Sequence, residues 1–230
     1  MTLLRIDSSA RRDSVSRQLT QALIETWKKE NPAGQVIERD LAATPLPLIT
    51  DERALAVHSD PATLTPAQPE ALSVSGALME ELLVAVTIVG GAPVYNFTIS
   101  APLKAWIDQI VRVGRTVLWG PKGPEGVLKG NKVVVLTSRG GAYRPGTPTL
   151  QFDYQEQYLR HILAFIGLTD GLTDVTFIHA EHQKPGDRAE PARAAAMEQA
   201  QLAAAATDRA PCCAGASAVV AAGAATPRIN

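Results

Sequence analysis

Cysteine is almost missing from this sequence of 230 residues, and long apolar runs are missing altogether. The two cysteines, Cys212 and Cys213, are adjacent, so they predict neither a disulfide framework nor a spaced metal site. No stretch of about 18 apolar residues indicates a membrane-spanning helix, and the opening "MTLLRIDSSARR" lacks the apolar middle of a signal peptide. We therefore expect a cytoplasmic protein without a metal or a membrane partner.

Excess charge is missing too, because 22 Lys and Arg against 23 Asp and Glu leave a net charge of -1. This balance offers no basic surface to a nucleic acid. Aromatic residues make up only 5% of the chain, so each one inside a motif is informative. The four histidines show no catalytic spacing, and we interpret His179 as structural rather than as a general acid.

What the chain does contain is an alternation of short apolar runs with amphipathic stretches. The pattern predicts strands at 2–7, 35–41, 82–91, 132–138 and 174–180. It predicts helices at 14–30, 66–82 (capped by Thr65), 103–113, 154–167 and about 185–207, with surface connections at 42–65 and 120–132. Strands alternating with helices indicate an α/β fold, here a flavodoxin-like, doubly wound, five-stranded parallel sheet with helices on both faces.

A single domain is expected over residues 1–207, followed by an Ala-rich, low-complexity tail at 208–230 that is predicted to be disordered. Inside the domain, "GLTDGLTD" at 167–174 is a tandem copy that a loop should absorb. Sheets of this kind bind ligands beyond the carboxyl ends of their strands. The loops at 8–16, 92–100 and 138–147 should therefore lie along one edge.

The first of these loops, "SSARRDSVS", places several serines between a strand and the start of a helix. Unpaired backbone N–H groups and the helix dipole favour an anion there, and Arg11 or Arg12 could add positive charge. A phosphate monoester fits this site, whereas no G-x-G-x-x-G motif follows the strand to indicate a dinucleotide. The alternative is that Ser14 or Ser16 only caps the helix.

The second loop leaves a buried strand through Val94, Tyr95, Asn96 and Phe97, which offer an apolar wall next to amide donors. Gly91, at the strand end, would let the backbone approach a ligand closely. A planar heterocycle with polar edges would use these features. The alternative is that the two aromatic rings only cover the edge of the sheet.

The third loop, "TSRGGAY", combines the fixed charge of Arg139 with a glycine pair that permits close approach of a ligand. A guanidinium or an N–H group near one edge of a flavin would stabilise the reduced ring. A phosphate site, a flat wall and a donor-rich edge together predict one FMN site.

These motifs carry a resemblance: over residues 1–207 the sequence resembles the FMN-dependent NADH:quinone oxidoreductases, the azoreductase family. The matching stretches are "SS" at 8–9, "SVS" at 14–16, "GAPVYNFTISAPLKAWID" at 91–108, "GPEGVLKGNK" at 123–132, "TSRGG" at 137–141 and "FIGLTD" at 165–170. The chain departs from the family pattern at Val94, where methionine is usual, in the doubled "GLTD" and in the Ala-rich tail.

The resemblance implies bound FMN, NADH or NADPH as the electron donor, and a quinone or an azo compound that accepts two electrons in a ping-pong cycle. It implies no catalytic side chain. The FMN-binding residues that it implies are Ser9, Ser14, Val15, Ser16, Val94, Tyr95, Asn96, Phe97, Ser138, Arg139, Gly140 and Gly141. It also implies a homodimer in which Trp119 and Phe165 reach toward the flavin of the other subunit, although both rings could instead pack locally.

Two other functions remain open from the sequence. One is a flavodoxin-type electron carrier that passes single electrons to a protein partner, although such carriers are strongly acidic and this chain is not. The other is a flavin-free module in which the serine loop binds a different phosphate. The colour of the purified protein distinguishes the second case.

Overall fold

The computed structural model describes residues 1–59, 65–169, 175–184 and 186–206. The strands are β1 (Thr2–Asp7), β2 (Gln35–Asp40), β3 (Thr87–Pro93), β4 (Val117–Gly120), β5 (Gly123–Gly126), β6 (Lys132–Ser138) and β7 (Val175–Ala180). The helices are α1 (Val15–Glu30), α2 (Asp51–His58), α3 (Ala67–Val84), α4 (Ala101–Ile110), the short 3-10 helix η2 (Leu150–Phe152), α5 (Tyr154–Phe165) and α6 (Ala189–Ala205).

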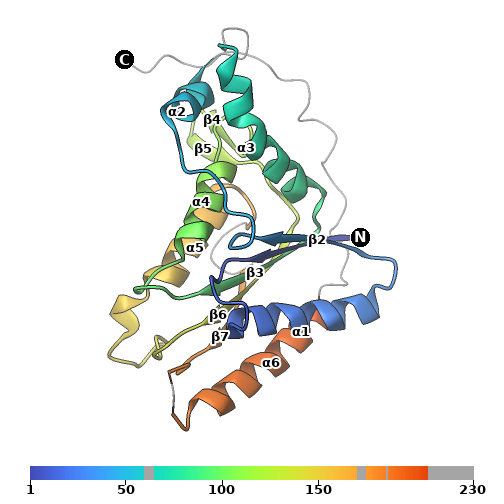
Figure 1. Ribbon diagram of the computed structural model, residues 1–230, viewed down its shortest axis with the longest axis vertical. Helices are drawn as coiled ribbons and strands as arrows, with labels where there is room; N and C mark the ends of the chain where they lie inside the picture. Colours follow the sequence, from blue (N-terminus) through green and yellow to red (C-terminus); the bar gives the residue numbers. More distant parts are fainter. Residues whose placement is uncertain (60–64, 170–174, 185, 207–230) are drawn as a thin grey trace.

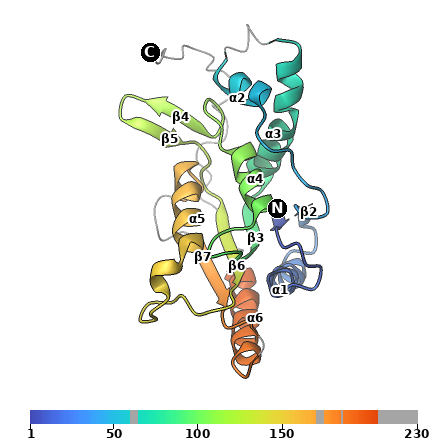
Figure 2. The same cartoon turned by 60° about the vertical axis from the view of Figure 1, so that its left-hand side comes forward.

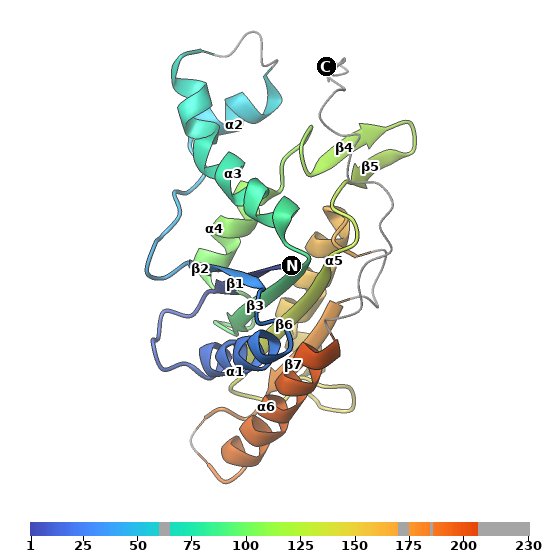
Figure 3. The same ribbon diagram turned by 90° about the vertical axis from the view of Figure 1, so that its right-hand side faces the viewer.

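Five of these strands form one parallel sheet in the order β2-β1-β3-β6-β7. The order reverses between β1 and β3, which is the switch point of a doubly wound sheet. The sheet crosses the middle of the molecule, with α1 and α6 on one face and α3, α4 and α5 on the other (Figures 1 and 3). The predicted flavodoxin-like fold is confirmed.

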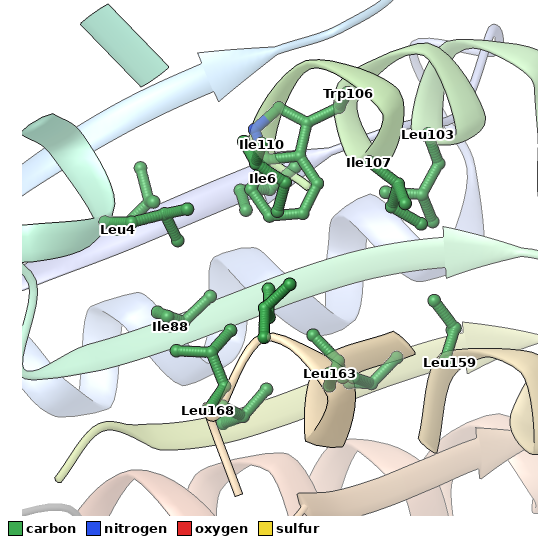
Figure 4. Close-up of a cluster of buried hydrophobic side chains, with 14 of the residues drawn as sticks. Leu4, Ile6, Ile88, Leu103, Trp106, Ile107, Ile110, Leu159, Leu163 and Leu168 are labelled. Carbon is green, nitrogen blue, oxygen red and sulfur yellow. The ribbon is translucent and has the colours of Figure 1, made fainter. Parts of the chain in front are cut away.

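The side-chain alternation of the strands fills both faces of the sheet. Leu3 packs with Trp27 of α1 and the small residues of α6, whereas the next residue, Leu4, packs under α3 and α4. Figure 4 shows this second core, in which Trp106 and Leu163 come from different helices. Because large apolar side chains gain about 1.5–3 kcal/mol each on burial, the two cores together hold the helices on the sheet.

The third strand begins later than the sequence predicted. Residues 82–84 complete α3, and β3 starts at Thr87, which pairs with Leu3 of β1 and Lys132 of β6. The apolar run misled the prediction because Leu83 and Val84 are exposed at the end of a helix rather than buried in the sheet. The predicted cap is also wrong, since Pro66 occupies the cap position without a side-chain hydrogen bond.

The connection predicted over 42–65 contains the helix α2. Arg53 anchors this helix on α4, because its Nε donates to Gln109 Oε1 at 2.7 Å and its Nη2 to the carbonyl of Asp108 at 2.9 Å. These bonds also satisfy carbonyls at the end of α4. Among the described side chains of α2 only Arg53 and Ala56 are buried. The helix therefore leaves little apolar periodicity in the sequence, which explains why the prediction missed it.

The turn-rich segment at 120–132 supplies one strand of an antiparallel hairpin, β4 with β5, that extends away from the sheet (Figure 2). A Cβ at Gly126 would overlap the backbone of Gly167, at the end of α5. The N–H of Leu128 donates to the carbonyl of Ile166 at 3.1 Å in the same place. The base of the hairpin is therefore fixed by direct backbone contact.

Several predictions lie outside the described residues, namely the disordered tail at 208–230, the cysteine pair and the second copy of "GLTD". The last helix begins at Ala189 rather than near 185. Across the ranges that the structure describes, no helix combines the length and apolar character of a membrane span, and no group of three metal-binding side chains occurs.

Candidate functional site

The loops after β1, β3 and β6 are joined by hydrogen bonds at the carboxyl edge of the sheet. Ser8 donates to the carbonyl of Gly91 through its N–H, at 3.1 Å, and its hydroxyl, at 2.8 Å. Ser100 Oγ donates to the carbonyl of Ser8 at 3.0 Å, and Val94 N to that of Ser138 at 3.0 Å. The three predicted loops thus form one continuous surface.

The serine side chains of the first loop are buried but differ in their contacts. Ser14 Oγ accepts from Arg17 N at 3.4 Å and caps α1, so the capping alternative holds for this residue. Ser16 does not cap; its hydroxyl lies 3.3 Å from that of Ser14. Ser9 Oγ lies 3.5 Å from the hydroxyl of Tyr95, which links the first loop to the second.

The first turn of α1 retains open hydrogen-bond donors. The N–H groups of Val15 and Ser16 have no acceptor among the residues that the structure describes. The turn carries no acidic side chain, and the helix dipole places partial positive charge there. An anion placed between these amides and the buried serines would satisfy both sets of donors.

Arg17 is a further cation next to this loop, one that the sequence did not single out. Its Nη2 donates to the carbonyl of Ser9 at 2.8 Å, and its two Nη atoms each lie 2.7 Å from a carboxylate oxygen of Asp40. The hydrogen bond from Arg17 lowers the pKa of Asp40 to about 2. This pair therefore ties the end of β2 to the backbone of the serine loop.

Gly91 serves a different purpose from the one expected. A Cβ at this position would lie 2.5 Å from Asp7 Oδ1 and 3.0 Å from Thr20. Asp7 is buried, and burial raises the pKa of its carboxyl although Arg5 and Arg17 oppose that shift. The glycine thus makes room for a buried carboxyl group, a role that the sequence did not show.

The second loop is a tight turn with an unusual backbone. Tyr95 and Thr98 exchange backbone hydrogen bonds of 3.0 and 3.1 Å across Asn96 and Phe97, whose φ angles are +49° and +70°. Such corners normally carry Asn-Gly, because bulky residues are strained at positive φ. The side chain of Phe97 is half exposed, with its ring centroid 5.8 Å from that of Phe152. The ring thus has one aromatic neighbour and retains exposed apolar surface.

The third loop keeps its charge inside the protein. Arg139 is 2% exposed, and its Nη1 lies 2.9 Å from Asp153 Oδ2. This differs from the expectation that the guanidinium lies beside a ligand. The backbone N–H groups of Gly140 and Gly141 have no acceptor among the described residues, so they are the donors that this loop offers.

Comparison with known proteins agrees with this fold. The profile of a family with the flavodoxin-like fold matches residues 1–203. The FMN-dependent NADH:quinone oxidoreductase 2 of Trichormus variabilis is 46% identical over 189 residues, which cover 81% of this chain and 89% of that protein. The chain belongs to the family of FMN-dependent NADH:quinone oxidoreductases.

The chain is also similar to another oxidoreductase of this name and to solved azoreductase structures. The FMN-dependent NADH:quinone oxidoreductase 2 of Pseudomonas putida is 46% identical, covering 78% of this chain and 86% of that protein. The azoreductase of Bacillus anthracis (Sterne) superposes with a TM-score of 0.80 at 27% identity, over 89% of this chain and 98% of that structure. The azoreductase AzrA gives 0.81 at 28% identity, over 90% and 100%.

Two residues that the resemblance to the oxidoreductases places near the flavin of the other subunit lie away from the three loops. Trp119 is 61% exposed on β4, in the projecting hairpin (Figure 2). Phe165 ends α5, about 16 to 17 Å along that helix from its first residue beside the third loop. Its ring is partly buried against the core and stacks on His161 with a centroid separation of 6.5 Å. Within one subunit these rings do not meet the predicted flavin site.

The sequence did not reveal several residues that support the three loops of the candidate site. Asp40 and Arg17 are 23 residues apart, and no local pattern pairs them. Gln155 is an ordinary helix residue in the sequence, yet its side chain is completely buried between two loops. Only Asp153 carried a signal, because an aspartate directly before a helical stretch is a typical N-cap.

Proposed function

We propose that the protein is a cytoplasmic FMN-dependent NAD(P)H oxidoreductase that reduces quinones and azo compounds by two electrons. The observation that carries the proposal is the open donor set of Val15 and Ser16 at the start of α1, beside the buried Ser9 and the half-exposed Phe97. The names of the similar proteins, which are NADH:quinone oxidoreductases and azoreductases, support it.

The residues of the three loops fit the chemical groups of FMN. The serine hydroxyls and the first amides of α1 would hold the phosphate, with Ser14 orienting Ser16. The turn at 94–97 would lie along the isoalloxazine ring, for which Tyr95 and Phe97 supply apolar surface and Asn96 an amide. The amides of Gly140 and Gly141 would donate to a polar edge of the ring.

Bound FMN supplies two-electron hydride chemistry that protein side chains lack. The protein binds and orients the ring, and it keeps water from the reacting face. NADH or NADPH and the acceptor would use that face in turn, which is a ping-pong order. None of the four histidines is assigned a proton transfer; His179 is held between Thr137 and Glu156.

A homodimer is part of this proposal. The three loops would cover one side and the edges of the ring, and Trp119 is exposed on a hairpin that projects away from the sheet. A second subunit would bring this ring, and the neighbourhood of Phe165, over the flavin of the first and close the opposite face. Exposed apolar residues on the same hairpin, including Leu118, are consistent with such an interface.

A flavodoxin-type electron carrier is the second candidate. The net charge of -1 disfavours it, because carriers that dock on a protein partner depend on strong complementary charge. The high identity to enzymes that are named oxidoreductases disfavours it as well.

The serines test the proposal directly. Replacing both Ser9 and Ser16 by alanine removes hydrogen bonds to a charged phosphate worth roughly 1.5–3 kcal/mol each. We expect the affinity for FMN to fall by about two to four orders of magnitude, while riboflavin, which has no phosphate, binds both proteins alike. Fluorescence titration of the apoprotein measures both affinities.

A matched control is Ser73→Ala, which removes an exposed hydroxyl from α3. It should leave both affinities unchanged. Equal losses for FMN and riboflavin in the double variant would show that the two serines support the loop but do not bind the phosphate. A wild-type protein that binds neither flavin would refute the proposed function itself.

A further inference from the structure

The side chain of Gln155 connects two of the candidate flavin loops from inside the protein. It lies in the first turn of α5 and is completely buried. Its Nε2 donates to the carbonyl of Ala92, at the end of β3, at 2.9 Å. Its Oε1 lies 3.5 Å from Arg139 Nη2, in the loop after β6. One amide group therefore contacts the segments that precede the 94–97 turn and the Gly140-Gly141 amides.

The arginine on the other side of this contact is itself held rigidly. Arg139 Nη1 lies 2.9 Å from Asp153, and Arg139 Nη2 lies 3.6 Å from Glu156. The backbone of Arg139 makes two hydrogen bonds. Its N–H donates to the carbonyl of Ala180, at the end of β7, at 2.9 Å, and its carbonyl accepts from the N–H of Gln183 at 2.8 Å. The position of this loop thus depends on buried contacts rather than on surface residues.

Asp153 makes the arrangement more rigid still, because it has two tasks. One carboxylate oxygen accepts from the N–H groups of Gln155 and Glu156, at 3.1 and 3.0 Å, and caps α5. The other pairs with Arg139. The start of the helix, and with it the position of the Gln155 amide, is therefore fixed by the same ion pair that holds the loop.

We propose that Gln155 is a positioning residue that sets the spacing between the Tyr95–Phe97 turn and the Gly140-Gly141 amides, and thereby the fit of the flavin ring. The inference rests on the proposed function, since both segments are assigned to the flavin there. Glutamine suits the task because it is a donor toward Ala92 and an acceptor toward Arg139 at once. Glutamate lacks the donor, and methionine, of similar length, lacks both.

This role predicts an effect on the ring rather than on the phosphate. If the two segments shift, FMN and riboflavin lose affinity by the same factor, in contrast to the serine variants. The absorbance spectrum of bound flavin shifts as well, because the donors along the ring edge move. A residue that only stabilises the fold would change neither property in the fraction of protein that remains folded.

The experiment compares Gln155→Met with Gln157→Met, two residues along the same helix at an exposed position. We expect Gln155→Met to weaken FMN and riboflavin equally, by about tenfold or more, and to shift the flavin spectrum. The control should do neither. Thermal melts of the apoproteins report how much of each sample is folded.

Gln155→Glu is the second variant, and it tests the positioning role if Gln155→Met does not yield folded protein. It keeps the acceptor for Arg139 but places a carboxylate oxygen against the carbonyl of Ala92, so both affinities should fall here too. Folded Gln155 variants with wild-type affinity and spectrum would overturn the inference. They would leave the proposed function intact, because the wild type would still bind FMN.

Discussion

Glu156 gives the sharpest quantitative prediction, because a single carboxylate meets three basic side chains. Its oxygens lie 3.0 Å from His179 Nε2, 2.6 Å from Arg160 Nη2 and 3.6 Å from Arg139 Nη2. The hydrogen bond from His179, followed by that from Arg160, lowers the pKa of Glu156 from 4.5 to about 2 although burial opposes the shift. The substitution Glu156→Gln removes the charge and keeps the shape.

The size and sign of the effect follow from this pKa. A drop from 4.5 to about 2 amounts to about 3.4 kcal/mol at ~1.36 kcal/mol per pH unit. Because the side chain is partly exposed, solvent screening should leave about 1–2 kcal/mol. A carboxyl whose pKa is lower in the folded state stabilises the fold above pH 4.5, and this stabilisation is lost as the pH falls toward 2.

Urea denaturation followed by tryptophan fluorescence tests the prediction at pH 7 and at several values down to about pH 3. Glu156→Gln should be less stable than the wild type by about 1–2 kcal/mol at pH 7, with a gap that narrows as the pH falls. The matched control is Glu198→Gln, at an exposed position of α6, which should match the wild type throughout. A gap that is absent at pH 7, or that stays constant with pH, would refute the reasoning.

Two further predictions concern the charged loop and the subunit interface. Arg139→Leu should lower the free energy of unfolding by about 3–5 kcal/mol, because it leaves the buried carboxylate of Asp153 without its cation; a loss below about 1 kcal/mol in chemical denaturation would contradict the ion-pair argument. Trp119→Ala should lower quinone turnover while the FMN content stays near that of the wild type, and the wild type should elute as a dimer that loses specific activity on dilution. Full activity in a monomer would rule out the shared site.

The alternation of the chain predicted the parallel sheet and the three loops at its carboxyl edge well. Apolar strand runs and helical periodicity are local signals, and a parallel sheet places the carboxyl ends of its strands on one edge. The serine loop was located correctly because the end of β1 and the start of α1 are both legible in the sequence. The start of β3 was not located correctly, because an apolar run does not reveal whether it belongs to a helix or to a strand.

The details of the candidate site depend on contacts between distant residues, and these have no local signature. An arginine in a Gly-rich loop reads as a ligand-binding cation, but its charge is compensated by Asp153, 14 positions later in the chain. Likewise, Gly91 reads as a site of close ligand approach, whereas it accommodates the buried Asp7. Charge compensation and steric room depend on three-dimensional neighbours, so the sequence alone did not reveal either role.

The backbone at Phe97 has a consequence for any attempt to make this protein more heat-resistant. At a φ of +70° a glycine would relieve the local strain, whereas the phenylalanine keeps a half-exposed ring on the surface. A selection that rewards thermostability alone would thus favour exchange at this corner, whereas the proposed contact of the ring with the flavin means that a selection for turnover would oppose it. The two kinds of laboratory evolution should therefore diverge at residue 97.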